Sequence, residues 1–295
     1  MRLLGKTGVP ISVMGYGCGG LWGYEAFDEK RATRLVHMAL DGGVTFLDTG
    51  ASYSGGNAEI RLGKILKGID KSQVFIGTKA GTVVHNGRLY KDYSQTSIVS
   101  QAHASLKKLG LERLPLLQLH GIPRDGLESA LDTLDMLKQQ GKVNMIGASC
   151  DGASLEHALS FNRLDVVMLT YNLVEKHAIR QVRKAYSQGC GVLVKSPLAH
   201  TLYSTDIFKI KNLSDLWYLL RVFKNYRSQL LEGRKYRFIN HIEGWSSHDI
   251  ALCYALADQV SCVVTGTTDE RHMQSNLAAL EKDLPAELRT KIDSV

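Results

Sequence analysis

Residues 44–60 read VTFLDTGASYSGGNAEI and place two side chains that can exchange protons close to the end of a predicted strand. The apolar run Val44–Leu47 has the composition of a buried strand, and it ends at Asp48. A short polar segment then brings Tyr53, before Gly55 and Gly56 break the chain. An Asp after a strand is usually a cap or turn residue, and a nearby Tyr usually packs. The function of this stretch therefore depends on what the rest of the chain brings to it.

Two later segments repeat the pattern of a strand that ends in a polar residue. The run 74–78 is followed by Lys79, and the run 116–119 is followed by His120. The carboxyl ends of parallel strands meet at one edge of a sheet, so these side chains are expected to lie together with Asp48 and Tyr53. Asp48 and Lys79 alone would most often form a structural ion pair, and Tyr53 with His120 makes the group a candidate for catalysis.

The chain alternates strand-like and helix-like segments along its length. Strands are predicted at 13–22, 44–47, 74–78, 116–119, 143–148, 166–170, 191–194 and 262–265, and helices at 28–41, 58–66, 96–108, 127–140 and 176–187. The connections are too long for hairpins, which indicates a parallel sheet, and eight such units close into a (β/α)8 TIM barrel. A single domain over residues 1–295 follows, and residues 2–12 are expected to form an N-terminal β-hairpin.

One long segment, 203–245, separates the seventh and eighth strands. Its stretch 215–239 has Leu216, Leu219, Leu220 and Phe223 at helical spacing among basic residues, which predicts a helical insertion. Insertions after a barrel strand lie on the active face, so this helix is either a lid over the site or a cover on the side of the barrel.

Composition excludes several classes of protein. The chain has 295 residues, of which 44% are hydrophobic, and a formal net charge of +7 that is spread without a basic run. We therefore expect no nucleic-acid partner, no membrane span and a cytoplasmic location. The five cysteines are widely spaced, which favours free thiols and indicates no metal site. The sequence leaves the oligomeric state open between a monomer and a weak homo-oligomer.

The segments FLDTGASY, IGTKAG and LQLHG together resemble the aldo-keto reductases, and the resemblance runs over nearly the whole chain. It implies that Asp48, Tyr53, Lys79 and His120 form the catalytic group, with Tyr53 as general acid. It further implies a nicotinamide cofactor, NADPH with NADH possible, a small-molecule carbonyl substrate, and an N-terminal hairpin that plugs the barrel floor. Trp22 is expected near the mouth as a wall for substrate or as a buried structural residue.

The same resemblance implies where the cofactor would bind. The candidate cofactor residues are Gly19, Asp48, Ser149, Lys195, Ser196, Leu198, Gly266, Thr267, Arg271 and Asn276. Three positions depart from the family pattern: Cys150 and Met168 replace the usual amide partners of the nicotinamide, and Lys195 replaces an aromatic residue. Lys195 is expected either against the nicotinamide or turned toward the pyrophosphate. Gly266 and His272 stand where basic residues usually hold a 2′-phosphate, and Arg271 could substitute.

Reduction of a carbonyl needs a hydride on carbon and a proton on oxygen. A free phenol has a pKa of about 10 and gives up its proton reluctantly, so a buried Lys79 held by Asp48 is expected to favour the phenolate. His120 would orient and polarise the carbonyl. Two other functions stay open from the sequence: a nicotinamide-binding sensor or assembly module, and a redox-neutral epimerase or lyase on the same barrel.

Overall fold

Eight parallel strands form a closed barrel in the computed structural model, which describes residues 1–204 and 227–295. They are β3 (Met14–Gly17), β4 (Phe46–Asp48), β5 (Phe75–Ala80), β8 (Leu114–His120), β9 (Val143–Ser149), β10 (Val166–Thr170), β11 (Gly191–Lys195) and β12 (Cys262–Thr265). Each strand pairs with the next one along the chain, and β12 closes the ring against β3. The predicted (β/α)8 barrel is confirmed.

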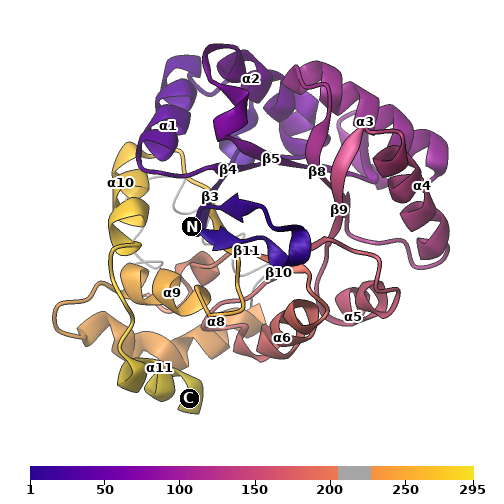
Figure 1. Ribbon diagram of the computed structural model, residues 1–295. Coiled ribbons are helices and arrows are strands. Elements are labelled where there is room, and N and C mark those ends of the chain that lie inside the picture. Colours follow the sequence, from indigo (N-terminus) through magenta and orange to yellow (C-terminus); the bar gives the residue numbers. More distant parts are fainter. Residues whose placement is uncertain (205–226) are drawn as a thin grey trace.

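Helices surround the barrel on its outer side, as Figure 1 shows in a view along the barrel axis. The described helices are α1 (Glu29–Asp41), α2 (Asn57–Ile65), α3 (Gln95–Leu109), α4 (Leu127–Gln139), α5 (Gly152–Ser160), α6 (Ile179–Ser187), α8 (Arg227–Gly233), α9 (Ser247–Ala255), α10 (Glu270–Ala279) and α11 (Ala286–Ser294). Within the described ranges, no helix is long and apolar enough to cross a membrane.

Helix α1 illustrates how the sequence determines these elements. The Asp28 side chain accepts a hydrogen bond from the backbone amide of Arg31 and caps the first turn. Leu35 and Val36 then fall on one face and are buried against the barrel. The helix ends before Gly43, whose φ of 81° belongs to the left-handed region that glycine tolerates. The chain can therefore turn directly into β4.

Strand β4 shows how alternation separates two cores. Leu47 packs outward in the large core between barrel and helices, whereas Phe46 packs in the smaller core inside the barrel. Asp48 is two residues after Phe46, so it faces the barrel interior at the carboxyl end of the strand. We call this end of the barrel the mouth.

The predicted N-terminal hairpin is also confirmed. Strands β1 (Arg2–Leu3) and β2 (Pro10–Ile11) pair antiparallel, and Leu4 and Ile11 are fully buried in the inner core. The hairpin lies across the barrel end that is opposite the mouth (Figure 1). It closes the floor, as the resemblance implied.

The structure adds a second hairpin that sequence reasoning did not predict. Strands β6 (Thr82–His85) and β7 (Arg88–Lys91) pair antiparallel directly after β5. Asn86 and Gly87 connect them with φ angles of 48° and 71°, and Asn-Gly is the preferred pair for such a two-residue turn. The signal was therefore present in the sequence HNGR.

The long segment before β12 is described only in part. Leu216, Leu219, Leu220 and Phe223, on which the predicted insertion helix rests, lie outside the described residues. The end of the predicted stretch forms α8, followed by a 3-10 helix over Arg234–His241. The predicted helix 176–187 also begins with a 3-10 turn, Lys176–Ala178, before α6.

Candidate active site

The barrel brings the four predicted catalytic residues together at the mouth. Asp48, Lys79 and His120 lie at or near the carboxyl ends of β4, β5 and β8, and Tyr53 begins a 3-10 turn (Tyr53–Gly56) after β4. Lys79 Nζ lies 2.5 Å and 2.7 Å from the two Asp48 carboxylate oxygens. It also donates to the Thr49 carbonyl oxygen at 2.8 Å. These acceptors fix the ammonium inside the barrel.

Tyr53 lies between the lysine and the histidine. Lys79 Nζ is 4.8 Å from the centroid of the Tyr53 ring, and the Tyr53 and His120 rings meet edge to face with centroids 5.5 Å apart. Gly19 and Gly50 border the Tyr53 ring, because a Cβ atom on Gly19 would lie 2.6 Å from Tyr53 Cδ2 and one on Gly50 3.1 Å from Cδ1. Gly19 therefore has a local role that sequence reasoning did not assign: it leaves room for the catalytic ring.

Burial sets the protonation states of the group. Burial raises the pKa of Tyr53 above its ordinary value, although Lys79 acts in the opposite direction. The expected effect of Lys79, which favours the phenolate, is present but is smaller than the effect of burial on the pKa. Tyr53 therefore keeps its proton. For Lys79, burial lowers the pKa, but Asp48 and Tyr53 together outweigh it and raise the pKa, so the ammonium stays charged. Burial, assisted by Lys79, lowers the pKa of His120 to about 3, so the imidazole is neutral.

The second hairpin is hydrogen-bonded to the backbone of His120. Lys91 Nζ donates to the His120 carbonyl oxygen at 2.5 Å and to Thr82 Oγ1 at 2.8 Å. The Tyr93 hydroxyl donates to the same His120 carbonyl oxygen at 3.0 Å. The backbone of His120 is therefore held from the side of β7, which sequence reasoning missed together with the hairpin.

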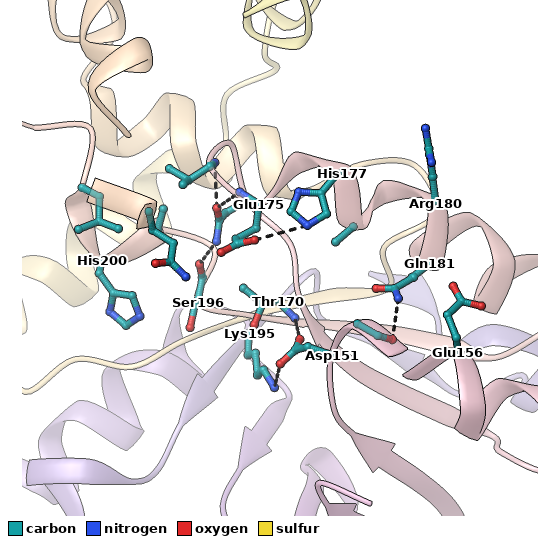
Figure 2. Close-up of a pocket in the computed structure, with 17 residues that line it drawn as sticks. Asp151, Glu156, Thr170, Glu175, His177, Arg180, Gln181, Lys195, Ser196 and His200 are labelled. Atoms are coloured by element: carbon teal, nitrogen blue, oxygen red, sulfur yellow. Dashed lines mark hydrogen bonds and ion pairs between the residues drawn. The ribbon is translucent and has the colours of Figure 1, made fainter. Parts of the chain in front are cut away.

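Lys195, at the end of β11, forms an ion pair that the sequence did not predict. Its Nζ lies 2.8 Å from Asp151 Oδ2, and Asp151 Oδ1 accepts from the Thr170 amide at 2.6 Å (Figure 2). Whether Lys195 lies against the nicotinamide or toward the pyrophosphate stays a prediction, and the ion pair is a further contact of its ammonium. Asp151 follows β9, which is two strands away from β11 in the barrel, and its carboxylate reaches across the end of β10 to the ammonium. The pair borders a cavity of about 590 Å³ that also reaches Arg180.

Similarity to known proteins agrees with this geometry. The family model described as "Aldo/keto reductase family" matches residues 13–295. The chain belongs to the aldo/keto reductase family. It is 25% identical to the NADH-specific methylglyoxal reductase of Escherichia coli strain K12, over 95% of this chain and 93% of that protein. It is 31% identical to the aldo-keto reductase YhdN of Bacillus subtilis strain 168, over 59% of this chain and 54% of that protein.

Solved structures of aldo-keto reductases share the fold. The aldo-keto reductase AKR11C1 from Bacillus halodurans, in its holo form, superposes with a TM-score of 0.81 at 25% identity, over 99% of this chain and 95% of that one. The glycerol dehydrogenase AKR11B4 from Gluconobacter oxydans superposes with a TM-score of 0.83 at 21% identity, over 99% of this chain and 94% of that one, which supports the fold alone.

In this aldo/keto reductase, four of the predicted cofactor residues line one cavity between the ends of β11 and β12. Ser196, Leu198, Gly266 and Thr267 surround a space of about 520 Å³, and His272 borders it. A Cβ atom on Gly266 would meet only the Gly17 carbonyl oxygen, at 3.6 Å, so the backbone there is open to close approach. A groove with exposed backbone, hydroxyl groups and a histidine fits the phosphate-bearing half of a dinucleotide.

Three other predicted residues differ in how far they are exposed. Trp22 is not a wall for substrate: only 1% of it is exposed, its indole nitrogen donates to the Ala32 carbonyl oxygen at 3.2 Å, and it packs in the core. Asn276 is buried and its Oδ1 lies 2.7 Å from His248 Nε2, so the structure binds it to a neighbouring helix. Arg271 is 88% exposed beside Asp269.

Ser149 ends β9 opposite His120 and is buried. The adjacent Cys150 is buried too, and burial raises the pKa of its thiol to about 12, so it stays neutral. Met168 packs inside the barrel with the floor residues. Cys150 and Met168 therefore offer no amide group at the two positions where the family pattern has one.

Proposed function

We propose that this protein reduces the carbonyl group of a small polar metabolite to an alcohol, with NADPH as the hydride donor and Tyr53 as the proton donor. The observation that carries the proposal is the position of a protonated Tyr53 between a charged Lys79 and a neutral His120. A donor that keeps its proton in the resting state, beside a cation that stabilises its anion, is the arrangement that general acid catalysis needs.

Each side chain has a distinct role in the proposed reaction. A bound nicotinamide supplies the hydride that the carbonyl carbon receives. Tyr53 donates its hydroxyl proton to the carbonyl oxygen, and the phenolate that forms is stabilised by the ammonium of Lys79, which Asp48 and Thr49 hold in place. His120, which is neutral, donates a hydrogen bond that orients the carbonyl. Water returns a proton to Tyr53 after the product leaves.

NADPH is proposed over NADH because of the basic side chains beside the cavity between the ends of β11 and β12. His272 borders this cavity, and the exposed guanidinium of Arg271 lies one residue away. A guanidinium that is exposed and only loosely held, 3.5 Å from Asp269, is free to pair with a 2′-phosphate. The NADH-specific relative from Escherichia coli makes NADH the alternative. Arg271→Ala should lower kcat/KM for NADPH by about tenfold and leave NADH unchanged; equal effects on both would favour NADH.

The proposed chemistry is tested by deletion of one hydroxyl. Purified protein is incubated with aldehydes, ketones and sugars while the absorbance of the reduced nicotinamide is followed. Tyr53→Phe should lower kcat at least about a hundredfold and leave cofactor affinity within a few fold, because it removes a proton and little packing. Tyr93→Phe is the matched control, since its hydroxyl bonds only to the His120 carbonyl oxygen among the described residues.

The outcomes separate the alternatives. Unchanged turnover in Tyr53→Phe would refute the proposed role of Tyr53. Cofactor binding without turnover of any carbonyl in the panel would favour a sensor or assembly module. Conversion of a substrate with no change in nicotinamide absorbance would indicate a redox-neutral epimerase or lyase.

A further inference from the structure

Gln118 is a buried amide without a hydrogen-bond partner in the middle of the barrel. It lies on β8 between Leu116, which packs in the inner core, and His120, so all three face the barrel interior. Gln118 is fully buried, and neither its Nε2 nor its Oε1 finds a partner within residues 1–204 and 227–295. A buried amide that is left unpaired costs on the order of 1–3 kcal/mol. A leucine at this position would avoid that cost, so the amide is expected to have a role beyond packing.

The backbone opposite Gln118 makes room for it. Gly147 on β9 is its register partner, and a Cβ atom at this position would lie 3.1 Å from Gln118 Cγ and 2.6 Å from the Val166 carbonyl oxygen. The Gln118 side chain therefore fits here because residue 147 is a glycine, and a side chain at 147 would collide with it.

One ring nitrogen of His120 also lacks a hydrogen-bond partner. Its Nδ1 is buried and has no partner among the described residues. The ring is neutral, so one nitrogen carries a proton and the other has a lone pair that accepts. If Nε2 is to donate toward a carbonyl at the mouth, Nδ1 must be the acceptor, and a buried acceptor needs a donor.

Three other donors near His120 are already engaged elsewhere. Lys79 donates to both Asp48 oxygens and to the Thr49 carbonyl oxygen. Lys91 and Tyr93 donate to the backbone carbonyl oxygen of His120 rather than to its ring. Gln118 Nε2 keeps two hydrogens without acceptors. Residues two apart on one face of a strand are separated by about 7 Å, which an extended glutamine can span toward a histidine ring.

We propose that Gln118 is a positioning residue that donates a hydrogen bond from Nε2 to Nδ1 of His120 and thereby keeps the ring proton on Nε2, facing the mouth. A rotation about the Gln118 side-chain torsions makes this bond, and it satisfies two buried polar atoms at once. The use of the Nε2 proton rests on the proposed function. The choice of Nε2 as the protonated nitrogen rests on it as well, whereas the contact between the Gln118 amide and Nδ1 rests on the unpaired buried atoms of the two side chains.

The tautomer is measured directly by NMR on protein labelled with ¹⁵N in histidine, without cofactor or substrate. The chemical shifts of the two ring nitrogens identify which one carries the proton, and the signals of His120 are assigned by their loss in His120→Asn. Wild type should show a single neutral form with the proton on Nε2. Gln118→Met, of similar volume but without a donor, should show a mixture of both tautomers.

A second variant should shift the tautomer of His120 in the opposite direction. In Gln118→Glu a carboxylate faces Nδ1, so the proton should move to Nδ1 and the pKa of His120 should rise. Leu116→Met is the control on the same face of β8, and it should leave the tautomer unchanged. If reduction occurs as proposed, Gln118→Met should lower kcat about tenfold with little change in cofactor affinity.

Several results would overturn the inference. A wild-type ring with its proton on Nδ1 would refute it without any variant, so it remains testable even if a substitution at Gln118 prevents folding. An unchanged single tautomer in Gln118→Met would assign Gln118 to packing. Absence of carbonyl reduction together with the expected tautomers would refute the proposed function and leave the hydrogen bond in place.

Discussion

Acidification should destabilise the fold through His120, by an amount that its burial determines. The pKa of this ring is lowered from 6.5 to about 3, mainly by burial and to a smaller extent by the positive charges of Lys79 and other lysines. Between pH 7 and pH 5 the unfolded chain takes up a proton at this position and the folded protein does not. Stability is therefore lost as pH falls through 6.5, and the loss continues down to about pH 3.

The magnitude follows from the linkage relation. One pKa unit corresponds to about 1.4 kcal/mol, and the window from 6.5 to 5 spans about 1.5 units, so His120 should remove about 2 kcal/mol of the free energy of unfolding. The chain has nine other histidines, so the quantity to measure is the difference from a variant that lacks this ring. His120→Asn keeps a polar side chain of similar size without titrating.

Urea denaturation at pH 7, 6 and 5, for both proteins, provides the test. Wild type should lose about 2 kcal/mol more than His120→Asn over this range, with unchanged m-values. Parallel losses in the two proteins would mean that His120 titrates at its ordinary pKa in the folded state. That result would refute the neutral imidazole on which its proposed role depends.

Three further outcomes are expected. Gly19→Ala should displace the Tyr53 ring, because the new Cβ atom would lie 2.6 Å from it. The variant should lower kcat by about tenfold or more at nearly unchanged thermal stability. An unchanged kcat would show that the ring can move aside without loss of function. Asp151→Asn should release Lys195 from its 2.8 Å ion pair and weaken NADP⁺ relative to NADPH, by up to about tenfold in the ratio of titrated Kd values, and an unchanged ratio would place the ammonium away from the nicotinamide. Gly87→Val, at a φ of 71°, should cost about 1–2 kcal/mol in urea unfolding, with faster amide exchange confined to β6 and β7; full stability would indicate that the turn rearranges.

The barrel and the catalytic group could be predicted because both depend on local sequence patterns. Asp48, Lys79 and His120 each end a short apolar run, and parallel strands in a barrel must bring such ends to one edge. The second hairpin could also have been found, since Asn86-Gly87 is a strong two-residue turn signal between residues of high strand propensity. It was missed because the segment was read only as a connection between a strand and a helix.

The cofactor side could not be predicted from sequence to the same depth. The partner of Lys195 is Asp151, which stands 44 positions earlier and follows a different strand, so only the closed barrel brings them together. Trp22 was ambiguous for a similar reason, because the position of Ala32 and the core around it decide that the indole is buried. Side-chain pairing across strands depends on register and rotamers, and a single sequence contains no direct record of either.

The two halves of the site differ in how tightly their charges are constrained. Asp48 and Lys79 are almost fully buried, so removal of either partner would leave an uncompensated charge in the barrel, which costs about 3–5 kcal/mol in comparable pairs. Lys195 and Asp151 are 32% and 50% exposed, so water can replace either partner at about 0–1 kcal/mol. If Tyr53 acts as proposed, stability and proton chemistry depend on the same buried pair. Of the three departures from the family pattern, Cys150 and Met168 are buried, and only Lys195 forms a partly exposed ion pair of this kind.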